Sequence, residues 1–161
     1  MRLTPQIKQS PNRILIGMSL SMSLVSDKTP QLFRQFMPRR NEILHRINKS
    51  VWDLKTYPED YFRNFSPTSI FTKWALTEVP VVEEIPEGME VFQLPGGLYA
   101  VFHHQGLMTD NSIFTYIYSD WLPHSMYQLD GRPHFDVLSE KAQIRDPKAR
   151  QEIWVPIKPK I

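Results

Sequence analysis

The segment Gln9-Ser10-Pro11-Asn12-Arg13-Ile14-Leu15-Ile16 decides the fold, because a segment of similar type returns later in the chain. Its counterpart is Gln93-Leu94-Pro95-Gly96-Gly97-Leu98-Tyr99-Ala100, at an offset of 84 residues. Two further pairs follow in the same order, residues 36–38 with 121–123 and residues 52–54 with 135–137, at offsets of 85 and 83. Identities within each pair are few, but the shared order and spacing predict two copies of one supersecondary unit.

The first copy, about residues 1–85, has the pattern of strand, strand, helix, strand, strand. Apolar and serine side chains alternate strictly from Met18 to Leu24, which is typical of a half-buried strand. Thr29-Pro30 offers a helix N-cap followed by proline, and apolar residues at helical spacing continue to residue 48. A break is expected at Pro38, because proline has no N–H to donate. The other strands are expected at residues 5–9, 50–57 and 71–79.

The second copy, about residues 86–161, repeats this pattern. Asp110 or Asn111 can cap a helix that runs to Trp121, where Leu122-Pro123 is expected to stop it. The sequence therefore predicts an α+β fold with two helices packed on antiparallel sheet, in a single domain that spans residues 1–161. The expected strands lie at residues 91–94, 98–105, 134–138 and 151–158, the first two joined by the turn Pro95-Gly96-Gly97.

Composition excludes several classes of protein. The 161 residues include no cysteine, which rules out disulfides, thiolate zinc sites and cysteine nucleophiles. The 19 basic and 17 acidic residues leave a net charge of only +2, and the basic pair Arg39-Arg40 fits a solvated helix face better than a nucleic-acid groove. No apolar stretch is long enough to span a membrane and no secretion signal is recognised, so a cytoplasmic location is expected. The five histidines lack metal-ligand spacing, and neither a metal nor a cofactor is expected.

The closing strand carries the most informative single residue, Glu152. Strand alternation places Glu152, Trp154 and Pro156 on one face and apolar residues on the other. One interpretation is an edge strand whose glutamate points into water. The other is a carboxylate at the floor of an aromatic pocket, where an unpaired charge costs several kcal/mol and awaits a proton or a cation. A lipophilic cation offsets the cost of burying the carboxylate, and each nearby ring adds about 0.5–2 kcal/mol of cation–π attraction.

Several segments, taken in order, resemble the GyrI-like, or AraC-type, effector-binding domains. They lie in both halves of the chain: residues 36–40 (Phe-Met-Pro-Arg-Arg), 71–75 (Phe-Thr-Lys-Trp-Ala), 97–106 (Gly-Leu-Tyr-Ala-Val-Phe-His-His-Gln-Gly), 121–123 (Trp-Leu-Pro), 133–137 (Pro-His-Phe-Asp-Val) and 152–157 (Glu-Ile-Trp-Val-Pro-Ile). The resemblance implies tandem βαββ repeats related by pseudo-twofold symmetry, with a ligand cleft between them. It also implies binding of hydrophobic, often cationic, small molecules of the multidrug type.

The position that matches the acid of this family is Glu152. The candidate walls that the resemblance implies are Tyr99, Trp121, Tyr127, Phe135 and Trp154. Because no helix-turn-helix segment is recognised, the expected role is a stand-alone sensor or sequestering module without direct contact to nucleic acid or membrane. Two alternatives stay open. One is a small-molecule hydrolase that uses Glu152 as general base, and the other is a gyrase-inhibitor-like module that acts on a protein partner. A homodimer is also possible.

Overall fold

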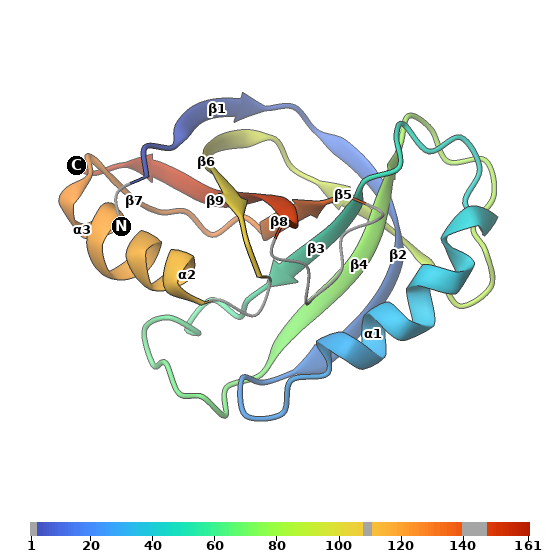
Figure 1. Cartoon of the computed structure of the whole chain (residues 1–161), viewed down its shortest axis with the longest axis horizontal. Coiled ribbons are helices and arrows are strands. Elements are labelled where there is room, and N and C mark those ends of the chain that lie inside the picture. The colour runs from blue at the N-terminus through green and yellow to red at the C-terminus, as the bar shows by residue number, and fades with distance from the viewer. Residues whose placement is uncertain (1–2, 108–110, 140–147) are drawn as a thin grey trace.

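The computed structural model describes residues 3–107, 111–139 and 148–161 (Figure 1). A long antiparallel sheet forms its centre, and two helical regions pack against one of its faces. In chain order the elements are β1 (Gln6–Ser10), β2 (Arg13–Met22), α1 (Thr29–Phe36), η1 (Met37–Glu42), β3 (Val51–Thr56), β4 (Phe71–Val79), β5 (Glu90–Leu94), β6 (Gly97–Gln105), α2 (Ser112–Tyr116), η2 (Ile117–Trp121), α3 (Leu122–His124), β7 (Tyr127–Leu129), β8 (His134–Leu138) and β9 (Arg150–Pro159).

The sheet has the internal symmetry that the sequence predicts. Its strand order is β1-β6-β9-β8-β3-β4-β2-β5, with β7 paired to β9 off this path. Each strand of the first repeat has a counterpart in the second: β1 and β5, β2 and β6, β3 and β8, β4 and β9. When the two members of each pair are exchanged, the same strand order results, read from the opposite edge of the sheet. At the centre, β3 and β8 pair antiparallel with Asp53 opposite Asp136, two residues that are equivalent in the duplication. The α+β class and the pseudo-twofold arrangement of two repeats are therefore confirmed.

The two equivalent turns of the duplication meet at one end of the sheet. The Gly96 N–H donates a hydrogen bond of 2.7 Å to Asn12 Oδ1, across the offset of 84 residues. A Cβ atom on Gly96 would lie only 2.5 Å from the Ser10 carbonyl oxygen, so this close approach requires glycine. The turn after Leu94 is not a hairpin, because β5 pairs with β2 whereas β6 pairs with β1 and β9.

The two faces of the sheet have different surroundings. On one face, called the helix face below, α1 packs on Ile16 and Ala75, and α2 with η2 packs on Ala100 and Ile153. The opposite face, called the cleft face, carries a third apolar cluster that spans both repeats. Its buried members are Leu15, Trp52, Leu54, Leu76, Leu94, Tyr99, Val101, Phe135 and Trp154. Within the described part of the chain, no helix has both the length and the apolar character needed to cross a membrane.

The first helical region is shorter than its apolar pattern predicts. The α-helix ends at Phe36, and a 3-10 segment with Pro38 in its first turn follows to Glu42, so the expected break is confirmed. Residues beyond it are not helical, because Ile43 adopts an extended conformation and leaves Leu44 and Ile47 exposed. The strand expected at residues 18–24 begins earlier, at Arg13, and ends at Met22. Its early start follows from pairing, since residues 13–17 form the ladder with β5.

The second helical region is longer than predicted. It passes from α2 through a π-helical turn and ends at His124, so Leu122-Pro123 does not stop it at Trp121. Pro123 is the second residue of α3 and follows directly on the π-helical turn, and Trp121 and Leu122 before it keep right-handed helical dihedral angles. Asn111 is the N-cap residue and makes no side-chain capping bond, whereas Asp110 lies outside the described residues. The short strand β7 was not predicted, because three residues show no readable alternation.

Candidate functional site

The cleft face holds an open cleft of about 770 Å³ near the middle of the sheet. Its walls come from both repeats, with Trp52 and Glu78 from the first and Glu152 and Trp154 from the second. The strand register explains why these side chains share a face. Trp52 lies opposite Leu76 and Val137, and Val137 lies opposite Glu152, so alternation along each strand points Glu78 and Trp154 to the same side. The cleft is therefore a product of the seam between β3 and β8, where the two repeats join.

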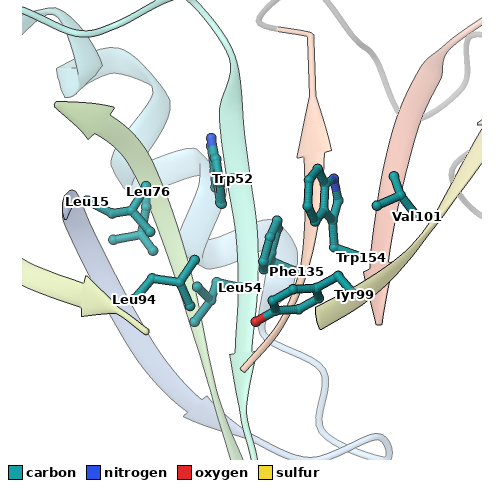
Figure 2. Close-up of a cluster of buried hydrophobic side chains, with 9 residues drawn as sticks. All are labelled: Leu15, Trp52, Leu54, Leu76, Leu94, Tyr99, Val101, Phe135 and Trp154. Atoms are coloured by element: carbon teal, nitrogen blue, oxygen red, sulfur yellow. The ribbon is translucent and has the colours of Figure 1, made fainter. Parts of the chain in front are cut away.

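Three stacked rings form the floor of the cleft. Phe135 lies between Trp52 and Trp154, with ring centroids 4.5 Å and 5.1 Å away and interplanar angles of 26° and 21° (Figure 2). Tyr99 packs against Phe135 and Trp154 at centroid distances of 5.1 Å and 5.7 Å. The Tyr99 hydroxyl donates a hydrogen bond to the Pro133 carbonyl at 2.9 Å, and burial raises the pKa of this phenol to about 12. The floor is thus rigid and aromatic.

Glu152 stands at the rim of this floor with one carboxylate oxygen anchored. The Trp154 indole Nε1–H donates a hydrogen bond of 3.2 Å to Glu152 Oε1. The nearest basic nitrogen is His103 Nδ1, 3.9 Å from Oε2, which is too long for a hydrogen bond. The side chain of Glu152 is 37% exposed. Among the residues that the structure describes, Glu152 therefore has no lysine or arginine in contact, and its charge faces the cleft.

A second acid in the cleft, Glu78, is fully paired. Arg13 Nη1 donates hydrogen bonds of 3.1 Å to both carboxylate oxygens of Glu78, and Arg13 Nε donates to Ser10 Oγ at 3.2 Å. The guanidinium carbon lies 5.4 Å from the ring centroid of Trp52 and 5.9 Å from that of Trp154. Neither Arg13 nor Glu78 is among the site residues predicted from the sequence. A reading of alternation along residues 71–79 would have placed Glu78 on the face of Leu76.

The predicted site residues separate into two groups. Glu152 and Trp154 line the cleft, and Tyr99 and Phe135 lie directly beneath them. Trp121 and Tyr127 lie with the apolar cluster of the helix face, where their rings stack at 6.4 Å and Trp121 packs on Phe102. The structure therefore does not bring Trp121 and Tyr127 to Glu152. The reason is geometric, because η2 packs on the face of β9 that carries Ile153 and Ile157, and β7 pairs with β9 in a register that points Tyr127 to that same face.

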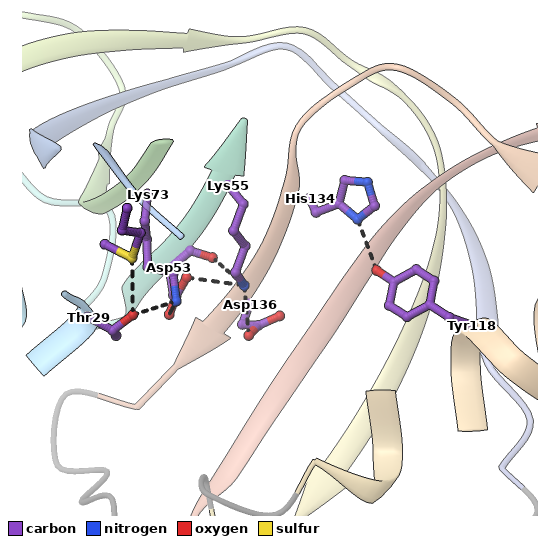
Figure 3. A network of polar contacts seen from close by, with 8 residues as sticks. Thr29, Asp53, Lys55, Lys73, Tyr118, His134 and Asp136 are labelled. Carbon is purple, nitrogen blue, oxygen red and sulfur yellow. Dashed lines mark hydrogen bonds and ion pairs between the residues drawn. The ribbon is translucent and has the colours of Figure 1, made fainter. Parts of the chain in front are cut away.

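The helix face carries its own charged network, directly behind the cleft (Figure 3). Lys55 Nζ lies 3.0 Å from Asp136 Oδ2 and 3.1 Å from Asp53 Oδ1. Lys73 Nζ lies 3.4 Å from Asp53 Oδ2 and donates to Thr29 Oγ1 at 2.9 Å. Two carboxylates and two ammonium groups thus meet at the pseudo-twofold axis, all largely buried.

Burial and pairing set the ionisation of this network. Burial alone would raise the pKa of Asp53, but the ammonium groups of Lys55 and Lys73 outweigh it and hold the pKa below its usual range. Burial raises the pKa of Asp136, which among the described residues has a single ion-pair partner, Lys55, and which also faces the charge of Asp53. The pKa of Lys55 is raised, because its two carboxylate partners outweigh its burial. The network is charged, mutually neutralised and closed to large ligands.

An aromatic cap continues this network toward α2. The Tyr118 hydroxyl lies 3.0 Å from His134 Nδ1, and the Phe62 ring stacks on His134 at a centroid distance of 5.6 Å. Burial, together with the smaller effect of the Lys55 charge, lowers the pKa of His134 to about 3. Burial also raises the pKa of Tyr118. The space left among these groups is about 90 Å³, so only a few water molecules fit there.

Comparison with known proteins assigns the chain to a family. Residues 6–157 match the family described as integron-associated effector binding protein. Transcriptional regulator BrlR of Pseudomonas aeruginosa is 26% identical over 156 residues, which cover 94% of this chain and 54% of the regulator. The chain thus spans about half the length of this curated relative. The resemblance to effector-binding domains drawn from the sequence is confirmed.

Solved structures show the same fold. SAV2435, whose structure is bound to tetraphenylphosphonium, has a TM-score of 0.66 at 15% identity, covering 98% of this chain and 94% of that one. The C-terminal domain of EcmrR has a TM-score of 0.71 at 12% identity, covering 99% of this chain and 100% of that one. Identity this low supports the shared architecture of the two repeats.

Proposed function

Because the chain belongs to the family of integron-associated effector binding proteins, we propose that it binds lipophilic, ring-bearing cations in the cleft beside Glu152. The single observation that carries this proposal is the pairing state of the two acids in the cleft. Glu78 has a guanidinium partner, whereas Glu152 has only an indole N–H among the described residues. A cationic ligand would supply the missing charge. The protein would then act as a sensor or sequestering module for such compounds.

The aromatic floor favours the same class of ligand. A cation beside Trp52 or Trp154, which line the cleft, gains about 0.5–2 kcal/mol from each ring, and flat apolar groups gain from burial against the same two rings. The volume of about 770 Å³ lies within the usual range for small-molecule sites. SAV2435, a structural neighbour, was solved with tetraphenylphosphonium, which makes this cation a suitable probe.

The test is a titration with two probes of equal shape and opposite charge, tetraphenylphosphonium and tetraphenylborate, followed by tryptophan fluorescence and calorimetry. We expect the phosphonium to bind in a one-to-one complex and the borate to bind at least tenfold more weakly. Glu152→Gln should weaken phosphonium binding by about tenfold, because about 1.4 kcal/mol of charge interaction is lost. Binding of the borate should strengthen or stay unchanged in the same variant.

A matched control is Glu84→Gln, which removes the same charge at an exposed position outside the cleft. Its phosphonium affinity should equal that of the parent protein, which separates a local effect of Glu152 from the effect of net charge. Equal phosphonium affinity in the parent and in Glu152→Gln would contradict the proposal. So would equal affinity of the parent for both probes.

A further inference from the structure

The cleft already contains a cation that belongs to the protein. The guanidinium of Arg13 lies within cation–π distance of Trp52 and Trp154 at the same time. Resting on the proposed function, we infer that Arg13 is a resident competitor of the ligand. It occupies the aromatic subsite of the empty cleft, and a ligand cation has to displace it from the two indole rings.

The position of Arg13 in the fold makes this competition possible. Arg13 is the first residue of β2, next to the turn where the two repeats meet, and the ladder with Leu94 fixes its backbone. Its side chain crosses the cleft face to reach Glu78 on β4. Three flexible methylene groups separate the charge from the backbone, which allows the guanidinium to shift without moving the strand.

Glu78 holds the competitor and keeps it from neutralising Glu152. Both hydrogen bonds to Glu78 come from Nη1, and the side chains of Arg13 and Glu78 are only 21% and 12% exposed. The pair therefore contributes no net charge, and the net negative charge of Glu152 stays available. A displaced Arg13 can also keep Glu78 as its partner, so displacement breaks ring contacts and leaves the ion pair in place.

The other basic group near the rings is less suited to this role. Lys8 Nζ lies 5.7 Å from the Trp154 ring, on the exposed strand β1, and contacts a single indole. Arg13 spans both indoles, and its planar group can stack on them as a ligand ring would. A small cation gains no more cation–π free energy from the two indole rings than the guanidinium loses when it is displaced. The competition therefore selects against small cations. Cations with several aromatic groups gain the additional apolar contact.

The experiment compares Arg13→Met and Glu78→Gln with the parent protein, using the same tetraphenylphosphonium and tetraphenylborate titrations. Arg13→Met removes the competitor and leaves Glu78 as a second free acid. We expect phosphonium affinity to rise about tenfold and borate affinity to fall. Glu78→Gln leaves the competitor in place and removes a negative charge. We expect it to weaken phosphonium binding by about threefold or more.

Opposite signs in the two variants distinguish competition from simple structural support. If Arg13 only braces β2 against β4, both variants lose phosphonium affinity, and the inference is overturned. Unchanged phosphonium affinity in Arg13→Met also overturns it. Circular dichroism and thermal melting check folding, and Arg13→Gln, which keeps polarity and much of the length, should change affinity in the same direction if Arg13→Met is unstable.

The outcome also separates this inference from the proposed function. Phosphonium binding that depends on Glu152 but does not increase in either Arg13 variant overturns the competitor role and leaves the proposed function intact. If the parent does not bind the phosphonium, or if its binding does not depend on Glu152, the proposed function is overturned. The competitor role of Arg13 is then overturned with it.

Discussion

The two faces of the sheet both carry acidic residues near the pseudo-twofold axis, but they differ in whether these carboxylates are paired with basic side chains. On the helix face, Asp53 and Asp136 contact Lys55 and Lys73 at 3.0 to 3.4 Å. On the cleft face, Glu152 contacts no lysine or arginine of the described residues and is 37% exposed. The comparison teaches that burial alone does not identify a ligand site. The informative feature is a carboxylate in a cleft whose charge the surrounding side chains do not meet.

The internal symmetry explains why the helix face needs its lysines. The duplication places the equivalent residues Asp53 and Asp136 directly opposite one another on β3 and β8. Like charges at opposed positions of an antiparallel pair are destabilising, and burial adds to the cost. Lys55 lies between the two carboxylates and Lys73 covers the outer side of Asp53. The network therefore stabilises the junction of the two repeats.

The largest expected effect concerns Lys55. Replacing it by methionine leaves Asp136 buried without a cation, and we expect a loss of about 3–5 kcal/mol in the free energy of unfolding. Urea denaturation followed by circular dichroism measures this loss. The double variant Lys55→Met/Asp136→Leu removes both partners and should recover part of the stability. A loss below about 1 kcal/mol in the single variant would show that the network is not structural.

The next effect in size is the response of the helix face to acid. The folded-state pKa of His134, about 3, is below its ordinary value of about 6.5, so the unfolded chain binds the proton more tightly. The contribution of neutral His134 to the free energy of unfolding is fully present above about pH 6.5 and is lost progressively as the pH falls toward 3. Between pH 7 and pH 5 we expect a loss of about 2 kcal/mol. Urea denaturation across this range measures it, and His134→Gln should flatten the dependence. An equal slope in both proteins would contradict it.

The smallest expected effect lies on the cleft face. Glu152→Gln should change the free energy of unfolding by less than about 0.5 kcal/mol, because the carboxylate is partly exposed and makes no lysine or arginine ion pair within the described part of the chain. The matched variant on the helix face is Asp136→Asn, which should cost at least about 1 kcal/mol because it leaves Lys55 with one carboxylate fewer. Thermal melting of the two variants side by side gives the comparison. Equal losses would remove the distinction between the faces.

Strands were predicted well where the apolar pattern extends over most of the strand. Residues 71–79 and 134–138 agree with β4 and β8 at both ends, and β9 differs from its expected range by one residue at each end. Helix ends were predicted less well, because local rules compete there. Apolar spacing after Pro38 suggested a helix to residue 48, but Ile43 reaches the core in an extended conformation, and the exposed Leu44 and Ile47 gain no burial from a helix.

The candidate site was predicted in part. Alternation within one strand placed Glu152 and Trp154 on a common face, which the structure shows lining the cleft. The pairing of Arg13 with Glu78 joins residues 65 positions apart, and no pattern along the chain signals it. Trp121 and Tyr127 were grouped with Glu152 by family resemblance, whereas η2 and β7 place them on the other face. Which rings share a cavity depends on the packing of elements from both repeats.

The sequence by itself determined the duplication, the order of the strands along the chain and the side of β9 that carries the acid. These properties depend on periodicities of two or of about 84 residues, and such periodicities are visible in one dimension. The tertiary structure alone decided which charges are neutralised. A carboxylate becomes structural or available according to whether a cation lies within about 4 Å. For Glu78 and Asp136 that cation comes from another strand, so the distance exists only after the strands have paired.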